Sequence, residues 1–263
     1  MKKFIIFIFA LLSTVAAANA VTIEAMRGKV TDGYNFWFYE PENSLLARDG
    51  KPLVIFLHGQ SLCGTDLNKV KRYGTISALE RGLDLDAFVI APQNPGGSWK
   101  PSKIMNVVDW ALMNYNIDPT RIYVLGMSLG GYGTIDLAAA YPDRIAAAIG
   151  MCGGATQKDL SGLANVPMWI IHGTGDASVS VSASDKVVDA IKKAQSAGDG
   201  INRLHYDRIP GMNHSTPARV FYRAEAYDWL MCHSLEDPGR PLTPTPKADS
   251  DFFNNAYKSL RKK

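Results

Sequence analysis

A serine placed between glycines is the residue best suited to act as a nucleophile. It is Ser128, in the segment Gly126-Met127-Ser128-Leu129-Gly130-Gly131, which follows the apolar run Arg121–Leu125 and opens a helix-like stretch. Between a strand and a helix, this pattern predicts a tight turn that exposes the serine hydroxyl. The first amides of the helix would face the space above it, where they favour negative charge. The alternative is a glycine-rich turn in which the serine is incidental.

A serine hydroxyl is a weak nucleophile at neutral pH and needs a base that a carboxylate orients. Two glycine-containing loops late in the chain supply these groups. Asp176 follows the strand-like run 168–172, and His214 follows the last strand-like run, 203–209. We therefore expect Ser128 to be the nucleophile, His214 the general base and then acid, and Asp176 the orienting carboxylate. Asp185 is the weaker candidate acid, because it falls on the next predicted helix and is expected to face solvent.

The other four histidines are expected to have structural roles. His58 and His172 each precede a glycine at the end of a strand, where a ring nitrogen can support a turn by hydrogen bonding. His205 lies within a predicted strand and His233 at the end of a predicted helix. His214 is therefore the preferred base.

Acyl transfer at a serine also needs hydrogen-bond donors for the oxyanion that forms on the substrate. The backbone N–H of Leu129, directly after the nucleophile, is one expected donor. The second should come from the loop His58-Gly59-Gln60-Ser61-Leu62-Cys63-Gly64, which follows an apolar strand. Within it the backbone N–H of Gln60 is preferred and that of Ser61 comes second. The loop can also be an ordinary strand-to-helix turn.

The elements that must position these residues alternate along the chain, as in an α/β fold with a mostly parallel sheet. The first two of the eight expected strands should form an antiparallel edge. The expected strands are 21–27, 34–39, 53–58, 87–91, 121–126, 146–151, 168–172 and 203–209. The expected helices are 67–81, 103–115, 128–141, 182–197 and 216–231.

The chain divides into three parts. Residues 1–20 read as a signal peptide, with a basic start, the apolar run Phe4–Leu12 and the small-x-small site Ala18-Asn19-Ala20. Export to the periplasm or the outside of the cell is therefore expected, without stable membrane insertion after cleavage. Residues 21–234 should form one domain. Residues 235–263 are a proline-rich tail with a short, basic amphipathic end, expected to pack as a strap or hang loose rather than act as an anchor.

Composition excludes several classes of function. The 263 residues are 46% hydrophobic and 20% charged, which is typical of a globular protein. The formal net charge of +3 is concentrated at the two ends, so the body is slightly acidic and nucleic-acid binding is not expected. Three cysteines, Cys63, Cys152 and Cys232, leave at least one thiol unpaired within a chain. Their spacing does not favour a structural zinc site, and the oligomeric state stays open.

Four segments together resemble the α/β-hydrolase superfamily. They are Leu57-His58-Gly59, Gly126-Met127-Ser128-Leu129-Gly130-Gly131, Gly173-Thr174-Gly175-Asp176 and Gly211-Met212-Asn213-His214. The chain looks most like the small carboxylesterase/phospholipase branch and secreted esterases related to feruloyl esterases and polyhydroxybutyrate depolymerases. The resemblance implies serine ester hydrolysis through an acyl-enzyme, without metal or cofactor. The oxyanion loop departs from it, because it reads His-Gly-Gln-Ser rather than His-Gly-x-Gly.

The loops suggest which esters are accepted. Only residues 152–166 separate two strands where many lipases insert a lid, so little or no lid is expected. In the loop after the fourth strand, Trp99 could stack on a sugar or aromatic acyl group while Gln93 and Asn94 bind hydroxyls. Equally, Trp99 could hold its own loop. Cys63 and Cys152 fall in loops expected near the pocket, where a bridge between them is one possibility.

These features predict an exported serine carboxylesterase that acts on a small-molecule or carbohydrate ester, with acetyl or feruloyl as the expected acyl group. Two alternatives stay open. One is a serine peptidase similar to the prolyl oligopeptidase catalytic domain, which shares the order of the three residues. The other is a non-catalytic binding module with a hydrolase fold.

Overall fold

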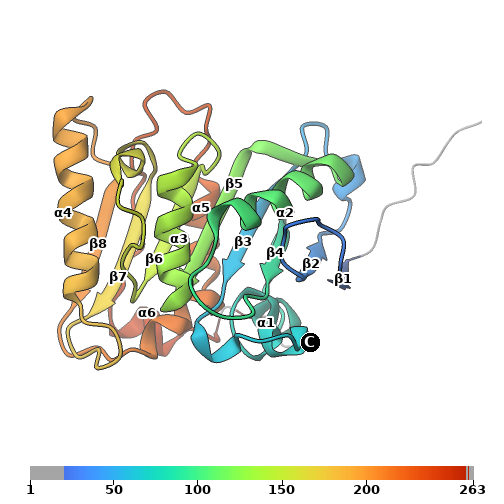
Figure 1. The fold of residues 1–263 in the computed structure, drawn as a ribbon, viewed down its shortest axis with the longest axis horizontal. Coiled ribbons are helices and arrows are strands. Elements are labelled where there is room, and N and C mark those ends of the chain that lie inside the picture. Colours follow the sequence, from blue (N-terminus) through green and yellow to red (C-terminus); the bar gives the residue numbers. More distant parts are fainter. Residues whose placement is uncertain (1–20, 259, 261–263) are drawn as a thin grey trace, which may run out of the picture.

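Eight strands form one sheet in the computed structural model, which describes residues 21–258 and 260 (Figure 1). Along the sheet the order is β1-β2-β4-β3-β5-β6-β7-β8. Strand β2 is antiparallel to both of its neighbours, whereas all pairs from β4 to β8 are parallel. The strands are β1 Thr22–Met26, β2 Phe36–Glu40, β3 Lys51–Leu57, β4 Phe88–Pro92, β5 Ile117–Met127, β6 Ala147–Met151, β7 Met168–Gly173 and β8 Leu204–Ile209. The expected mostly parallel sheet with an antiparallel edge is confirmed.

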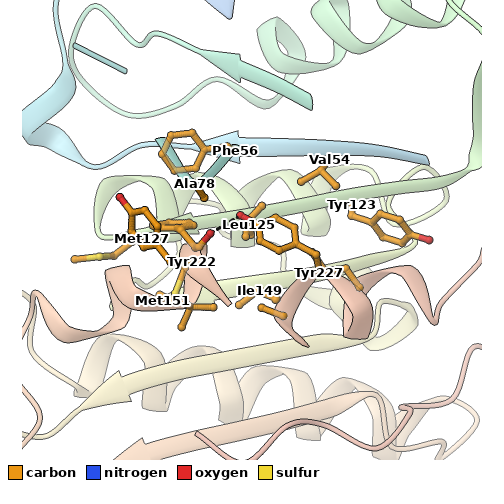
Figure 2. Close-up of a cluster of buried hydrophobic side chains, with 14 of the residues drawn as sticks. Val54, Phe56, Ala78, Tyr123, Leu125, Met127, Ile149, Met151, Tyr222 and Tyr227 are labelled. Carbon is orange, nitrogen blue, oxygen red and sulfur yellow. Dashed lines mark hydrogen bonds between the residues drawn. The ribbon is translucent and has the colours of Figure 1, made fainter. Parts of the chain in front are cut away.

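Helices cover both faces of the sheet (Figure 1). They are α1 Thr75–Glu80, α2 Pro101–Asn114, α3 Leu129–Ala140, α4 Ser182–Ala197, α5 Ala224–Met231 and α6 Ser250–Asn254. Along β3, Leu53, Ile55 and Leu57 pack on the layer of α2, α3 and α4, while Val54 and Phe56 pack on the layer of α1, α5 and α6. Figure 2 shows this second layer, with strand side chains facing Tyr227 of α5. Burial on both faces explains why the central strands are continuously apolar.

Two expected continuous helices are each broken into two pieces. The segment 67–81 forms a 3-10 helix, Leu67–Arg72, followed by α1. Gly74 separates them with a φ of +94°, and a Cβ there would lie 2.0 Å from the Phe56 ring, so glycine allows the chain to turn against the core. The segment 216–231 forms the 3-10 helix Thr216–Tyr222 and then α5, with an extended residue, Arg223, between them. Apolar spacing continues across both breaks, which is why the sequence predicted single helices.

The described part of the tail packs against the body of the protein. Phe252 and Phe253 of α6 are buried in the core layer of α1 and α5. Arg240 donates hydrogen bonds to the carbonyls of Pro142 and Ala146, at 2.8 and 3.1 Å. This part of the tail is therefore a strap.

The expected signal peptide, residues 1–20, lies outside the described residues. Across the described positions, no helix combines the length and the apolar character needed to span a bilayer.

Candidate active site

Ser128 occupies a sharp turn between β5 and α3. Its φ is +59°, in a region that residues other than glycine seldom adopt, so the backbone is strained here. The Ser128 amide donates to the carbonyl of Met151 at 2.8 Å, which ties the turn to the end of β6. A Cβ on Gly126 would lie 2.4 Å from the carbonyl oxygen of Gly130, and one on Gly130 would lie 1.8 Å from that of Leu57. Only glycine fits at these two positions, as the sequence pattern predicted.

Three side chains form an unbroken hydrogen-bonded chain at this turn. His214 Nε2 lies 3.0 Å from Ser128 Oγ, and His214 Nδ1 lies 2.6 Å from Asp176 Oδ2. Asp176 follows β7 and His214 follows β8, so both come from loops at the carboxyl edge of the parallel strands, the lower edge of the sheet in Figure 1. The Asp176 side chain is fully buried, whereas that of His214 is 24% exposed. This is the arrangement in which an imidazole can take a proton from a serine.

Asp176 is held as a carboxylate. Burial by itself raises its pKa, but hydrogen bonds from the Val179 amide, from His214 and from the Ser178 amide outweigh burial and lower it. The two amides donate to the same oxygen, Oδ1, each at 2.8 Å, which leaves Oδ2 facing His214. The loop thus fixes both the charge and the direction of the carboxylate.

The two expected oxyanion donors each begin a helical segment. Leu129 is the first residue of α3, and Gln60 is the first residue of a 3-10 turn, Gln60–Leu62. The first amides of a helix have no acceptor within the helix, so both can point at a ligand. The Gly59 amide, in contrast, already donates to the Tyr73 hydroxyl at 2.8 Å. Gln60 and Ser61 both line the cavity beside Ser128, and their role as donors stays a prediction.

His58 supports the loop that contains Gln60 by hydrogen bonding, as expected. Its Nε2 accepts from the Asn94 amide at 3.1 Å, so Nδ1 carries the proton and donates to the carbonyl of Gly59 at 2.7 Å. Burial lowers the pKa of His58 to about 4, although the bond to Gly59 acts in the opposite direction. The ring is therefore neutral at physiological pH and belongs to the support of the loop.

A cavity of about 540 Å³ opens directly over the serine and the imidazole. Its volume lies within the range typical of small-molecule sites. None of its lining residues is an aspartate, glutamate, lysine or arginine, and Met127, Val179 and Ala218 contribute apolar side chains. The lining residues are Gly59, Gln60, Ser61, Tyr73, Met127, Ser128, Ser178, Val179, His214, Ser215 and Ala218. The surface beside the nucleophile thus suits an uncharged ligand.

The residues expected to contact substrate from the loop after β4 are buried. Trp99 is 2% exposed, Gln93 4% and Asn94 1%. The indole of Trp99 donates to the carbonyl of His58, and the Gln93 amide donates to the carbonyls of Leu62 and Asp66. None of the three lines the cavity over Ser128. The structure therefore does not support sugar contacts from these three residues, and it agrees with the alternative in which Trp99 holds its own loop.

The cysteines form no bridge. Cys63, Cys152 and Cys232 are all free, so the pairing considered for Cys63 and Cys152 is absent. Cys152 is buried, with its Sγ 3.8 Å from the His214 carbonyl. Burial, the charge of Asp176 and a hydrogen bond to that carboxylate raise the pKa of the Cys152 thiol, so the thiol stays protonated.

One group of side chains could in principle hold a metal ion among the residues that the structure describes. Donor atoms of Cys152, His172 and Asp176 lie within 4.8 Å of one another. Both ring nitrogens of His172 already make hydrogen bonds, and Asp176 binds His214. An ion here would have to replace these bonds, so the arrangement favours the hydrogen-bonded cluster.

Two residues of the site were not predicted from the sequence. Tyr73 and Val179 line the cavity, and neither belongs to one of the recognised segments. Asp185, which was expected to face solvent, is 34% exposed, and its carboxylate accepts from the Tyr206 hydroxyl at 2.7 Å and from Arg208 at 3.1 Å. The position of Val179, three residues after the predicted acid, was the only available signal for its role.

Comparisons with known proteins identify a family model and several esterases that are similar to this chain. A family model described as Phospholipase/Carboxylesterase matches residues 99–228. Acetylxylan esterase A from Emericella nidulans is 43% identical over 70 residues, which cover 27% of this chain and 22% of that protein. Poly(3-hydroxyalkanoate) depolymerase C from Paucimonas lemoignei is 27% identical over 59% of this chain and 40% of its own. The chain thus spans less than half the length of these two relatives.

A longer match comes from the probable acetylxylan esterase A of Neosartorya fischeri, which is 25% identical over 94% of this chain and 71% of that protein. Among solved structures, a thermostable esterase superposes with a TM-score of 0.62 at 24% identity, covering 81% of this chain and 63% of the other. At 24% identity the superposition shows a shared fold and no more. The expected fold is thereby confirmed: the chain is an α/β-hydrolase-fold protein that is similar in sequence to esterases of this fold.

Proposed function

We propose that this chain is an exported serine carboxylesterase that hydrolyses carboxylic esters through an acyl-enzyme. The observation that carries the proposal is the continuous chain from Ser128 Oγ through His214 to Asp176, with distances of 3.0 and 2.6 Å, at the floor of an open cavity. If Ser128 were buried away from the cavity, or if His214 lay far from Ser128, the structure would not support ester hydrolysis. The similarity to esterases supports the same class of reaction.

The reaction follows from these positions. His214 Nε2 takes the proton of Ser128 as Oγ attacks the ester carbonyl, and the amides of Leu129 and Gln60 bind the oxyanion. His214 then gives the proton to the leaving alcohol, and Ser128 holds the acyl group as an ester. Water, deprotonated by His214, attacks this ester and releases the acid and the free serine. Asp176 stabilises the imidazolium that forms in both steps.

Acyl groups such as acetyl or feruloyl, on carbohydrates or other small esters, are the proposed substrates. The uncharged lining of the cavity favours a neutral ester, and its volume leaves space for a short or aromatic acyl group. Several relatives carry the name acetylxylan esterase, which supports a carbohydrate ester. No residue of the loop after β4 contributes to this argument, because Trp99, Gln93 and Asn94 are buried.

The test is a hydrolysis screen across acetylated xylan, feruloylated arabinose, p-nitrophenyl esters of short and long acids, and a chromogenic peptide. We expect short-chain or feruloyl esters to be the best substrates and Ser128→Ala to abolish their hydrolysis. Preference for the peptide would favour a serine peptidase. A protein that hydrolyses none of these esters and does not react with a fluorophosphonate would instead be a binding module.

Export is a separate part of the proposal and rests on residues 1–20 of the sequence. Amino-terminal sequencing of the protein recovered from the periplasm or the medium should begin at Val21. Recovery of the intact chain from the cytoplasm alone would contradict export and leave the proposed hydrolysis untouched.

A further inference from the structure

The carboxylate of Asp176 faces a second imidazole, which belongs to His172. This residue lies near the carboxyl end of β7 and is fully buried. Its Nε2 is 3.2 Å from Asp176 Oδ2, the same oxygen that His214 binds at 2.6 Å. The carboxylate oxygen that orients the proposed base is therefore shared between two histidines.

His172 also holds the loop that carries the acid. Its Nε2 donates to the carbonyl of Val179 at 3.0 Å, while the amide of Val179 donates to Asp176 Oδ1 at 2.8 Å. The ring thus acts on the carboxylate in two ways, by direct contact with Oδ2 and through the residue that binds Oδ1. Val179 also lines the cavity over Ser128, so the same contact shapes one wall of the site.

The other ring nitrogen is anchored on the opposite side. His172 Nδ1 lies 2.8 Å from Ser184 Oγ in the first turn of α4, and this hydroxyl donates its proton to the carbonyl of Gly153 at 2.7 Å. Because Ser184 has only one proton, it must accept the bond from Nδ1. On the Nε2 side, the Val179 carbonyl and the Asp176 carboxylate also accept. Each ring nitrogen therefore points at a hydrogen-bond acceptor, and the ring is held from both sides.

Few other titratable groups surround this ring. The Cys152 thiol stays protonated because burial and Asp176 raise its pKa. The Asp185 carboxylate on α4 interacts with His172 through its charge, but it is bound to Tyr206 and Arg208. Across Asp176 lies His214, the proposed base. Asp176 is thus the carboxylate that His172 contacts directly.

We propose that His172 is a positioning residue, which fixes the direction of the Asp176 carboxylate and thereby the orientation of His214. The expected effect on kcat rests on the proposed function, whereas the expected orientation of Asp176 and His214 does not. Displacement of a reacting group by about 1 Å can cost roughly 10²-fold in rate. Loss of the Nε2 donor should therefore slow acylation and leave substrate binding almost unchanged.

Two substitutions distinguish the contributions of the two ring nitrogens of His172. In His172→Gln the side-chain amide can reach the position of Nε2 and donate to Val179, whereas in His172→Asn it reaches only the position of Nδ1 and binds Ser184. We expect His172→Asn to lower kcat for a p-nitrophenyl ester about 10²-fold with little change in KM. His172→Gln should stay within about tenfold of the parent. Thermal unfolding of both variants reports any loss of fold.

His233 provides the matched control, because it is also a buried histidine with both nitrogens bonded, to the Trp229 carbonyl and to Thr243. His233→Asn should lower stability as much as His172→Asn and keep kcat near the parent value. Equal kcat for the two His172 variants, or a fall in kcat that only follows the loss of stability, would overturn the proposal. If neither variant folds, Ser184→Ala provides a third test, because it removes the hydrogen bond to His172 Nδ1. We expect this variant to lower kcat several-fold, and an unchanged kcat would overturn the proposal.

A second readout needs no substrate. The proton that His214 donates to Asp176 should give a low-field NMR signal in the parent and in His172→Gln, and the signal should shift or broaden in His172→Asn. An unaltered signal in His172→Asn would contradict the positioning role even in a protein without esterase activity. Conversely, a parent that hydrolyses no ester would contradict the proposed function and leave this test intact.

Discussion

Replacing Asp176 by asparagine tests the reasoning about the triad most sharply, because the structure dictates how the new side chain must lie. The amides of Ser178 and Val179 both donate to Oδ1, at 2.8 Å each. An asparagine can accept these bonds only through its carbonyl oxygen, so its NH₂ group must take the place of Oδ2. It then faces His214 Nδ1 as a donor. His214 would respond by carrying its proton on Nε2, which disables it as a base toward Ser128.

The expected loss of kcat follows from this shift of the His214 proton to Nε2. The same change in a serine triad lowers kcat about 10⁴-fold, equivalent to roughly 5.4 kcal/mol of barrier. We expect a loss of that order in kcat for p-nitrophenyl acetate, measured at neutral pH with an unchanged circular dichroism spectrum. Asp185→Asn is the matched control, since it alters the rival acid on α4, and it should keep kcat within about threefold. A loss below tenfold in Asp176→Asn, or a larger loss in Asp185→Asn, would refute the assignment of the acid.

The remaining predictions concern the turn, the pH dependence and the loops. Gly130→Ala would push a Cβ to 1.8 Å from the Leu57 carbonyl, so we expect a stability loss of roughly 4 kcal/mol or more in urea unfolding; a folded, active variant would contradict the geometry. Because His214 must accept the Ser128 proton, the kcat/KM for esters should fall on acidification, while Asp176 stays ionised because its pKa is lowered. An unchanged kcat/KM on acidification would count against His214 as the base. The pKa of His58 is lowered to about 4 in the folded protein, so the unfolded chain binds a proton more readily. The free energy of unfolding should therefore fall by roughly 3 kcal/mol as pH drops from about 6.5 to about 4. His58→Gln should make this fall smaller. Trp99→Phe removes the indole bond to the His58 carbonyl and should cost about 1 kcal/mol of stability, without altering the ratio of kcat/KM for acetyl and feruloyl esters; a changed ratio would restore a substrate role for Trp99.

The sheet and the three triad residues could be anticipated because each signal is local. Apolar runs mark the buried strands, and parallel strands bring their carboxyl ends to one edge whatever their distance in sequence. A residue just after such a run, such as Asp176 or His214, is therefore placed near Ser128 by topology alone. Their hydrogen bonds at 2.6 and 3.0 Å agree with that placement. Their roles in catalysis stay predictions until the variants are measured.

Other features depended on information that a linear pattern does not contain. The direction of a loop side chain is set by tertiary packing, so nothing in the segment 92–99 revealed that Trp99 points under the loop rather than out of it. The break at Gly74 depends on the ring of Phe56, which comes from another strand. In the same way, the histidine before Gly173 was recognised as a support for a turn, but its contact with Asp176 arises only when the loop folds back on β7.

The proposed mechanism requires Ser128 to carry the acyl group during turnover. Rapid mixing with p-nitrophenyl acetate, acid quenching and peptide mass spectrometry would measure it directly. We expect a transient acetyl ester on the peptide that contains Ser128, which forms in the parent and is absent from His214→Gln. Turnover of the ester without any acyl group on Ser128, or with the group on another residue, would contradict it.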